Sequence, residues 1–249
     1  MSVLNSELKA NFESFRADWM AQAHANWKAL EPLPCYLESY RRIAAIHGLK
    51  NDLVLSNFSS DSAGFFLEAH NDALVSHVAA SGGSWRSALQ ALRSLLENTL
   101  NAIYYKDHPV ELQLWLSGNA RLTFSELFSY MERHPSFSRF SNADNGLQFV
   151  KEEYATLSRA VHGSAVNFRM TDSAAAVLLW STEKAKAGAW ASREGKVIEA
   201  IALLFIYLFS DKLSGAQLPG LRSMLGYAIS NSKRTAIKSN LGVTIPAPE

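Results

Sequence analysis

The sequence predicts an all-α protein, a single-domain helical bundle of about eight to ten helices. Apolar residues recur three or four positions apart along most of the chain, which is the spacing of one face of an α-helix. Short segments of strictly alternating apolar and polar residues between turn pairs, the pattern of β-strands, are not found. With 249 residues, of which 48% are hydrophobic and 19% charged, the chain can also bury a large core.

The first predicted helix carries large apolar residues at the spacing of a single helical face. These residues are Phe12, Phe15, Trp19, Ala23, Trp27 and Leu30. Pro32 and Pro34 follow them, and proline disfavours the continuation of a helix. We therefore expect this helix to end before Pro32.

The later helices are predicted from the same periodicity and from the glycine, proline and serine residues between them. Their expected ranges are 36–46, 64–80, 85–105, 110–116, 123–133, 146–162, 173–190, 194–213 and 221–239. Thr123 and Glu126 have the spacing of a capping box at the start of one helix. Residues 134–145 form a polar connection, the nearest feature to a subdivision of the single domain predicted for residues 1–249.

The composition and charge of the chain bear on its partners, its compartment and the kinds of site it can contain. The net charge of +1 argues neither for nor against a nucleic-acid partner. Cys35 is the single cysteine, so we expect no intramolecular disulfide, no cysteine-based zinc site and a reducing compartment. The most apolar stretch, 200–209, is about half of the ~20 residues that cross a bilayer, and the first residues lack a signal-peptide pattern. We expect a cytoplasmic protein that does not enter a membrane.

Polar side chains on the long helix predicted over 85–105 fall within one stripe roughly 80° wide. They are Arg86, Gln90, Arg93, Glu97, Asn101 and Tyr104. One interpretation is a solvated face, stabilised by an Arg93–Glu97 pair that contributes about 0.2–0.5 kcal/mol. The other is a buried or cleft-lining stripe, because the rest of this helix is apolar and charges on a central helix need partners or a ligand.

The helix predicted over 146–162 places Ser158 and His162 on the flank of its apolar side, whereas Arg159 points towards solvent or a partner. A histidine in the last turn interacts favourably with the helix dipole. Alternatively, His162 faces the polar stripe of the long helix and carries a proton or contacts a phosphate there.

Two of these segments, residues 91–97 (ALRSLLE) and 154–164 (YATLSRAVHGS), resemble uncharacterised prokaryotic all-helical proteins of the HEPN-like superfamily. The resemblance covers about residues 64–164. It implies a helical bundle that dimerises, and many members are ribonucleases of toxin–antitoxin and phage-defence systems. Catalytic members place four to six residues between an arginine and a histidine, whereas only two separate Arg159 from His162. Ribonuclease activity therefore does not follow automatically from the resemblance.

A literal arginine–histidine spacing of this kind occurs elsewhere, at Arg42 and His47. The chain has enough arginines and histidines for roughly one such match by chance. Metal chemistry is not indicated, because His70 and His77 lie about 10 Å apart along one helix and cannot share an ion. We expect no metal and no cofactor.

The segment 212–248 carries basic residues and no acidic residue. The basic residues are Lys212, Arg222, Lys233, Arg234 and Lys238. A basic helix can bind RNA phosphates, and Lys233, Arg234 and Lys238 are the candidates for such binding. A solvated helix face explains the same pattern.

Two functional hypotheses follow. In the first, the protein is an HEPN-like homodimer that binds or cleaves RNA without a metal, with His162 and either Arg159 or Arg93 in the catalytic site. In the second, it is a non-catalytic scaffold or regulatory partner in which Arg93, Glu97 and His162 form a buried network. A third hypothesis is a small-molecule enzyme that uses a cleft beneath Tyr104 and Tyr105.

Overall fold

The structure is a computed structural model that describes residues 3–161 and 180–248, and every regular element within these residues is helical. The α-helices are α1 Val3–Leu30, α2 Pro34–Leu49, α3 Leu55–Asn57, α4 Ser60–Ser81, α5 Trp85–Asp107, α6 Pro109–Leu116, α7 Phe124–Arg133, α8 Leu147–Val161, α9 Lys184–Leu208, α10 Pro219–Gly226 and α11 Asn231–Leu241. A π-helical turn, Lys50–Val54, joins α2 to α3. Ten of the described α-helices have eight residues or more, which confirms the predicted all-α bundle.

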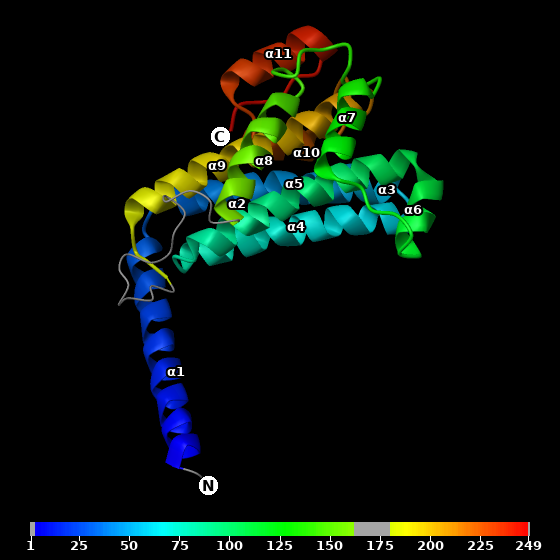
Figure 1. Ribbon diagram of the computed structural model, residues 1–249. Helices are drawn as coiled ribbons and strands as arrows, with labels where there is room; N and C mark the ends of the chain where they lie inside the picture. Colours follow the sequence, from blue (N-terminus) through cyan, green and yellow to red (C-terminus); the bar gives the residue numbers. More distant parts are fainter. Residues whose placement is uncertain (1–2, 162–179, 249) are drawn as a thin grey trace.

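The helices pack around α5 and α9. The helices α4 and α5 form a hairpin through a tight turn at Gly82 and Gly83, and α2, α5 and α8 each pack against α9 (Figure 1). At one end of the molecule lies α11, whose Lys233 Nζ is 5.6 Å from the centre of the Phe149 ring on α8, whereas α1 projects away from the other helices at the opposite end (Figure 1). One buried apolar cluster extends from Leu30 to Ile245 and includes residues on both sides of the loop at 134–145.

The second half of α9 is apolar on all sides. Every residue from Val197 to Tyr207 is buried, including Glu199, and Phe58 and Phe66 bring their rings against Phe205. A helix that is apolar all round must be enclosed by other helices or by lipid. None of the described helices is both long and apolar enough to cross a bilayer, and in this fold the neighbouring helices enclose α9.

Two predicted helix boundaries were wrong. The ranges 173–190 and 194–213 were expected as separate helices, but α9 runs without a break from Lys184 to Leu208, and residues 173–179 lie outside the described part. The charged residues at the expected break have partners, because Arg193 binds Glu153 and Glu194 binds Arg42. They can therefore lie inside a helix.

The expected helix at 221–239 is two helices, α10 and α11. The backbone N–H of Ser230, between them, donates a hydrogen bond to Glu199 Oε1 on α9 at 2.7 Å. This tertiary bond replaces the hydrogen bond that a continuous helix would make at this position.

Gly146 allows α8 to approach α9 closely. Its φ is +91°, and a Cβ at this position would lie 2.8 Å from the carbonyl oxygen of Ala200 and 3.0 Å from Leu203 Cβ. A side chain here would therefore meet both an unfavourable backbone conformation and the backbone of α9.

We expect Gly146→Ala to lower the free energy of unfolding by about 2 kcal/mol more than Gly118→Ala does. Gly118 is the matched control, because its φ is also positive, at +77°, but a Cβ added there would have no atom within 4 Å. Urea denaturation of both variants measures the difference. Equal losses of unfolding free energy in the two variants would show that the close approach of Gly146 to α9 does not affect stability.

Candidate functional site

The polar stripe of α5 meets α8 in a closed set of hydrogen bonds, called here the seam cluster, made of Arg93, Glu97 and Tyr154. Arg93 Nη2 donates to Glu97 Oε1 and to Tyr154 Oη, each at 2.9 Å. Tyr154 Oη donates in turn to Glu97 Oε1 at 2.9 Å. One carboxylate oxygen thus accepts from both of the other side chains, which fixes the register between α5 and α8.

The seam cluster lies at the edge of the bundle. The side chains of Arg93 and Glu97 are 25% and 34% exposed, so the ion pair is neither fully solvated nor enclosed. Along the whole stripe, Gln90 is exposed and the other members are half-buried. Partial burial strengthens the pair relative to a surface salt bridge and still leaves the guanidinium accessible from one side.

Phe124, at the start of α7, holds Tyr154 in place. The two rings stack with their centroids 3.4 Å apart and an angle of 1° between their planes. The expected capping box is present, since Thr123 Oγ1 accepts from the backbone N–H of Glu126 and Glu126 accepts from that of Thr123. The cap fixes where α7 begins and therefore where the Phe124 ring lies.

A pocket of about 410 Å³ opens beside the seam cluster. Its walls include Glu97, Asn98, Asn101, Trp115 and Arg121. The pocket thus combines the Arg121 cation, the amides of Asn98 and Asn101 and the Trp115 ring with the carboxylate of Glu97.

Asn98 connects this pocket to a second carboxylate, Asp72 on α4. Asn98 Nδ2 donates to Asp72 Oδ2 at 2.9 Å. Burial raises the pKa of Asp72 to about 6, although the Asn98 hydrogen bond opposes this shift. A wall residue of the pocket, Asn98, is thus bound to a carboxyl group that changes charge in the mildly acidic range.

The structure places the other candidate residues of α8 as follows. His162 lies outside the described residues. Arg159 is exposed, as the helical pattern predicted, and its Nη2 donates to Thr156 Oγ1 at 3.3 Å. One turn after Tyr154, the buried hydroxyl of Ser158 has no hydrogen-bond partner among the described residues, and neither has Arg93 Nε.

Arg42 and His47, which share the literal arginine–histidine spacing, make separate contacts. Arg42 is bound to Glu194, whereas His47 Nε2 pairs with Asn51 Nδ2 at 2.8 Å. The spacing along the chain therefore does not bring these two side chains to one site, as expected of a chance match.

Sequence reasoning missed a second polar cluster, which is centred on Glu194. The Glu194 side chain is only 2% exposed, and Oε2 lies 2.6 Å from both Nε and Nη2 of Arg42. Ser39 Oγ donates to Oε1 at 3.1 Å and also lies 3.0 Å from His77 Nδ1. The position of Glu194 four residues from both Trp190 and Ile198, on an apolar side of the helix, was a signal for it. Its partners are distant in sequence, and only the fold brings them together.

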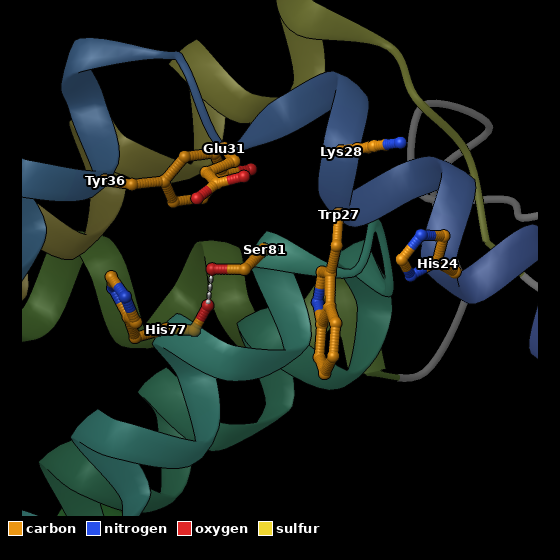
Figure 2. A pocket seen from close by; sticks show the side chains of 7 residues that line it. All are labelled: His24, Trp27, Lys28, Glu31, Tyr36, His77 and Ser81. Atoms are coloured by element: carbon orange, nitrogen blue, oxygen red, sulfur yellow. Dashed lines mark hydrogen bonds between the residues drawn. The ribbon is translucent and has the colours of Figure 1, made fainter.

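His77 links this cluster to a pocket of about 420 Å³ at the base of α1 (Figure 2). When the Ser39 hydroxyl donates its proton to Glu194, the Ser39 oxygen is left to accept a hydrogen bond from the protonated Nδ1 of His77. In the neutral ring, His77 Nε2 then carries no proton and can accept a hydrogen bond. Trp27 and Tyr36 supply rings to the pocket, and the Ser81 hydroxyl donates to the backbone oxygen of His77. Burial lowers the pKa of His77, so the neutral ring is favoured.

The three basic candidates on α11 are engaged with backbone carbonyl groups. Lys233 Nζ donates to Ala143, Arg234 Nη1 to Pro246 at 3.4 Å, and Lys238 Nζ to Gly242 at 3.3 Å. Lys238 is exposed and the other two are half-buried. The Lys233 contact attaches α11 to the loop before α8, and the other two contacts hold the segment that follows α11. None of the three residues lines the pocket beside the seam cluster.

Comparisons with known proteins supply no relative for this chain: no family model, curated protein or solved structure matches it. Among the described residues, no group of three or more His, Cys, Asp or Glu side chains is arranged to hold a metal ion. The function is therefore inferred from the seam cluster and the pockets of this chain.

Glu194 is expected to make the stability of the protein depend on pH. Burial raises its pKa from 4.5 to about 7, with Arg42 and Ser39 opposing the shift. The folded state therefore binds the proton more tightly than the unfolded state does. The resulting stability is present below pH 4.5 and is lost as the pH rises to about 7, by on the order of 3 kcal/mol.

We expect Glu194→Gln to remove this loss, because glutamine has a similar shape and does not titrate. The measurement is the free energy of unfolding of both proteins between pH 4.5 and 7.5, with Glu38→Gln as an exposed control that keeps the wild-type slope. If wild type and Glu194→Gln respond identically to pH, Glu194 is already ionised throughout this range.

Proposed function

We propose that this chain is an HEPN-like helical protein of a prokaryotic defence or toxin-type system that binds RNA along the α5–α8 seam and cleaves it in the cytoplasm. The observation that carries the proposal is the position of Arg93. Its half-buried guanidinium is held by Tyr154 and by Glu97, and Glu97 also lines a pocket of about 410 Å³.

The chemistry of the pocket suits a single-stranded nucleotide. Proteins bind unpaired bases by stacking them on aromatic or guanidinium planes and by hydrogen-bonding their edges with amides. Trp115 and Arg121 supply such planes, and Asn98 and Asn101 supply amides. Neutral overall charge is compatible with this mode, because one local cation and stacking carry the recognition.

The proposed cleavage needs no metal. His162, which follows Tyr154 by eight positions in the sequence, takes the proton of the 2′-hydroxyl group, and the 2′-oxygen attacks the adjacent phosphorus. The bond from phosphorus to the 5′-oxygen then breaks, and the 5′-oxygen takes a proton from water, which gives a 2′,3′-cyclic phosphate on one fragment and a 5′-hydroxyl group on the other. Arg93 stabilises the negative charge that develops on the phosphoryl oxygens.

We expect the purified protein to cleave single-stranded RNA in the presence of EDTA, and His162→Ala and Arg93→Gln each to lower the rate at least about 100-fold. The matched control is Arg41→Gln, because Arg41 is also paired with a glutamate on its own helix but lies away from the seam. A gel assay of a labelled RNA of mixed sequence measures the rates. No cleavage by the wild type, or equal cleavage by wild type and His162→Ala, contradicts the catalytic proposal.

The second candidate is a non-catalytic scaffold or regulatory protein in which the seam cluster fixes the register of α5 and α8. It is favoured by one observation: Glu97 Oε1 already accepts from both Arg93 and Tyr154, so these hydrogen bonds do not need a ligand.

A double-mutant cycle with Glu97→Gln and Tyr154→Phe separates the two candidates. For a structural network we expect each single change to cost about 1–2 kcal/mol of unfolding free energy and the pair to cost clearly less than the sum. Thermal and urea melts give these values, and RNA binding of the same variants is measured by fluorescence anisotropy. Unchanged stability with weakened RNA binding would exclude a purely structural role.

A further inference from the structure

The helix α1 has a docked half and an undocked half. Its last turns are attached to the bundle: Asn26 Nδ2 donates to the backbone oxygen of Gly82 at 3.2 Å, and Gln22 Nε2 donates to that of Trp180 at 3.0 Å. The rings of Trp19 and Trp180 meet edge to face at 5.5 Å. Before this point α1 runs beyond the rest of the molecule (Figure 1).

The undocked half exposes a continuous apolar face, called here the arm face. It consists of Leu4, Leu8, Phe12, Phe15 and Trp19, which are 63%, 56%, 58%, 55% and 38% exposed. At about 100° per residue these side chains fall within one arc roughly 80° wide. The two phenylalanines and the two leucines are each more than half exposed.

Such a face is not stable alone in water. Most helical stability comes from packing of an amphipathic face, and contiguous exposed apolar patches of several hundred Å² mark interaction sites. Leu4 to Trp19 extends about 24 Å along the helix axis. Something must therefore cover the arm face.

The charges of α1 favour a protein over a membrane surface. Helices that lie in a bilayer interface are rich in lysine and arginine on the polar face. The sequence of α1 contains three basic residues, Lys9, Arg16 and Lys28, and three acidic residues, Glu7, Glu13 and Asp18, and so has no excess of positive charge.

The arm face is complementary to a second copy of itself. Lys9 and Arg16 flank it on one side, roughly 80–100° from its centre, and Glu7 and Asp18 flank it at similar angles on the other. When two helices pack in parallel about a two-fold axis, each flank of one helix faces the opposite flank of the other. The basic flank of one copy then lies against the acidic flank of the other, although Arg16 also pairs with Glu13 of its own chain at 2.9 Å.

The available area is that of a dimer interface. A fully covered aromatic side chain buries about 150–250 Å², so the half-exposed residues of the arm face offer roughly 500 Å² per chain. Trp27 continues this apolar surface onto α4, because it lines a groove of about 430 Å³ together with Leu74, Val75 and Val78. Together these surfaces approach the ~800 Å² per partner of a stable interface.

We propose that α1 is a dimerisation arm, in which the arm faces of two copies of this chain pack against each other with the helices parallel. The proposal does not depend on activity towards RNA. It assigns Phe12 and Phe15 as the central anchors of the interface.

The test is the oligomeric state of the full chain, measured by sedimentation equilibrium. We expect a dimer for the wild type and an at least about 100-fold higher dissociation constant for Phe12→Ser/Phe15→Ser. The matched control is Ala10→Ser/Ala17→Ser, which places the same hydroxyl groups on the opposite side of α1 and should remain dimeric. Circular dichroism and thermal melting confirm that each variant keeps the folded bundle.

Two results overturn the proposal. One is a wild type that is monomeric at 100 μM, since about 100 μM is the weakest dissociation constant expected of such an interface. The other is a Phe12→Ser/Phe15→Ser variant that remains dimeric. Co-sedimentation of a monomeric wild type with phosphatidylglycerol vesicles would identify the arm as a lipid-binding helix and overturn it as well.

The orientation is tested by cross-linking in a Cys35→Ser background. Parallel helices bring Leu8 next to its own counterpart, so Leu8→Cys alone should form a disulfide-linked dimer on oxidation. An antiparallel pair would instead link Leu8→Cys to Phe15→Cys on another chain and not to itself. That second result would overturn the parallel arrangement.

Discussion

The second half of α9 has no side that faces solvent, and this burial determines where the other helices lie. Helices α2, α5 and α8 each pack against it, and Phe58 and Phe66 reach its Phe205 with ring centroids 6.2 and 4.8 Å away. Gly146 lets α8 begin within contact distance of the Ala200 backbone. Because the buried apolar area is the main favourable contribution to folding, these contacts with α9 hold the bundle together along with the packing of α5 against α4 and α8.

Buried charges decide which of the possible helix registers is adopted. Glu194 is bound by Arg42 from α2, and Glu153 on α8 accepts from Arg193 at 3.0 Å and lies 3.5 Å from Lys196. A shift of either helix by one turn would leave a carboxylate buried without its cation, which costs several kcal/mol. The apolar contacts thus hold the helices together, and the ion pairs select one arrangement among similar ones.

The candidate sites lie where this enclosure ends. At the α5–α8 seam Arg93, Glu97 and Tyr154 bind one another, whereas the side chains of Arg93 and Glu97 stay half-exposed. Along α1 large apolar groups are exposed instead, and none of the described residues covers them. Both features lie where the described helices do not enclose one another, and these are the two places at which we propose that a partner binds.

The helical class, most helix positions and the Arg93–Glu97 pair could be predicted from the sequence alone, because they depend on residues three or four positions apart. The same periodicity identified Arg159 as exposed, whereas His162 lies outside the described residues and its contact with the stripe stays a prediction. The contacts of Tyr154 with Arg93, and of Ser39 and His77 with the Glu194 cluster, required the folded structure, because helix packing brings these partners together. For the same reason the division between α10 and α11 was missed: it depends on a hydrogen bond from Ser230 to Glu199, 31 positions away, which no local pattern encodes.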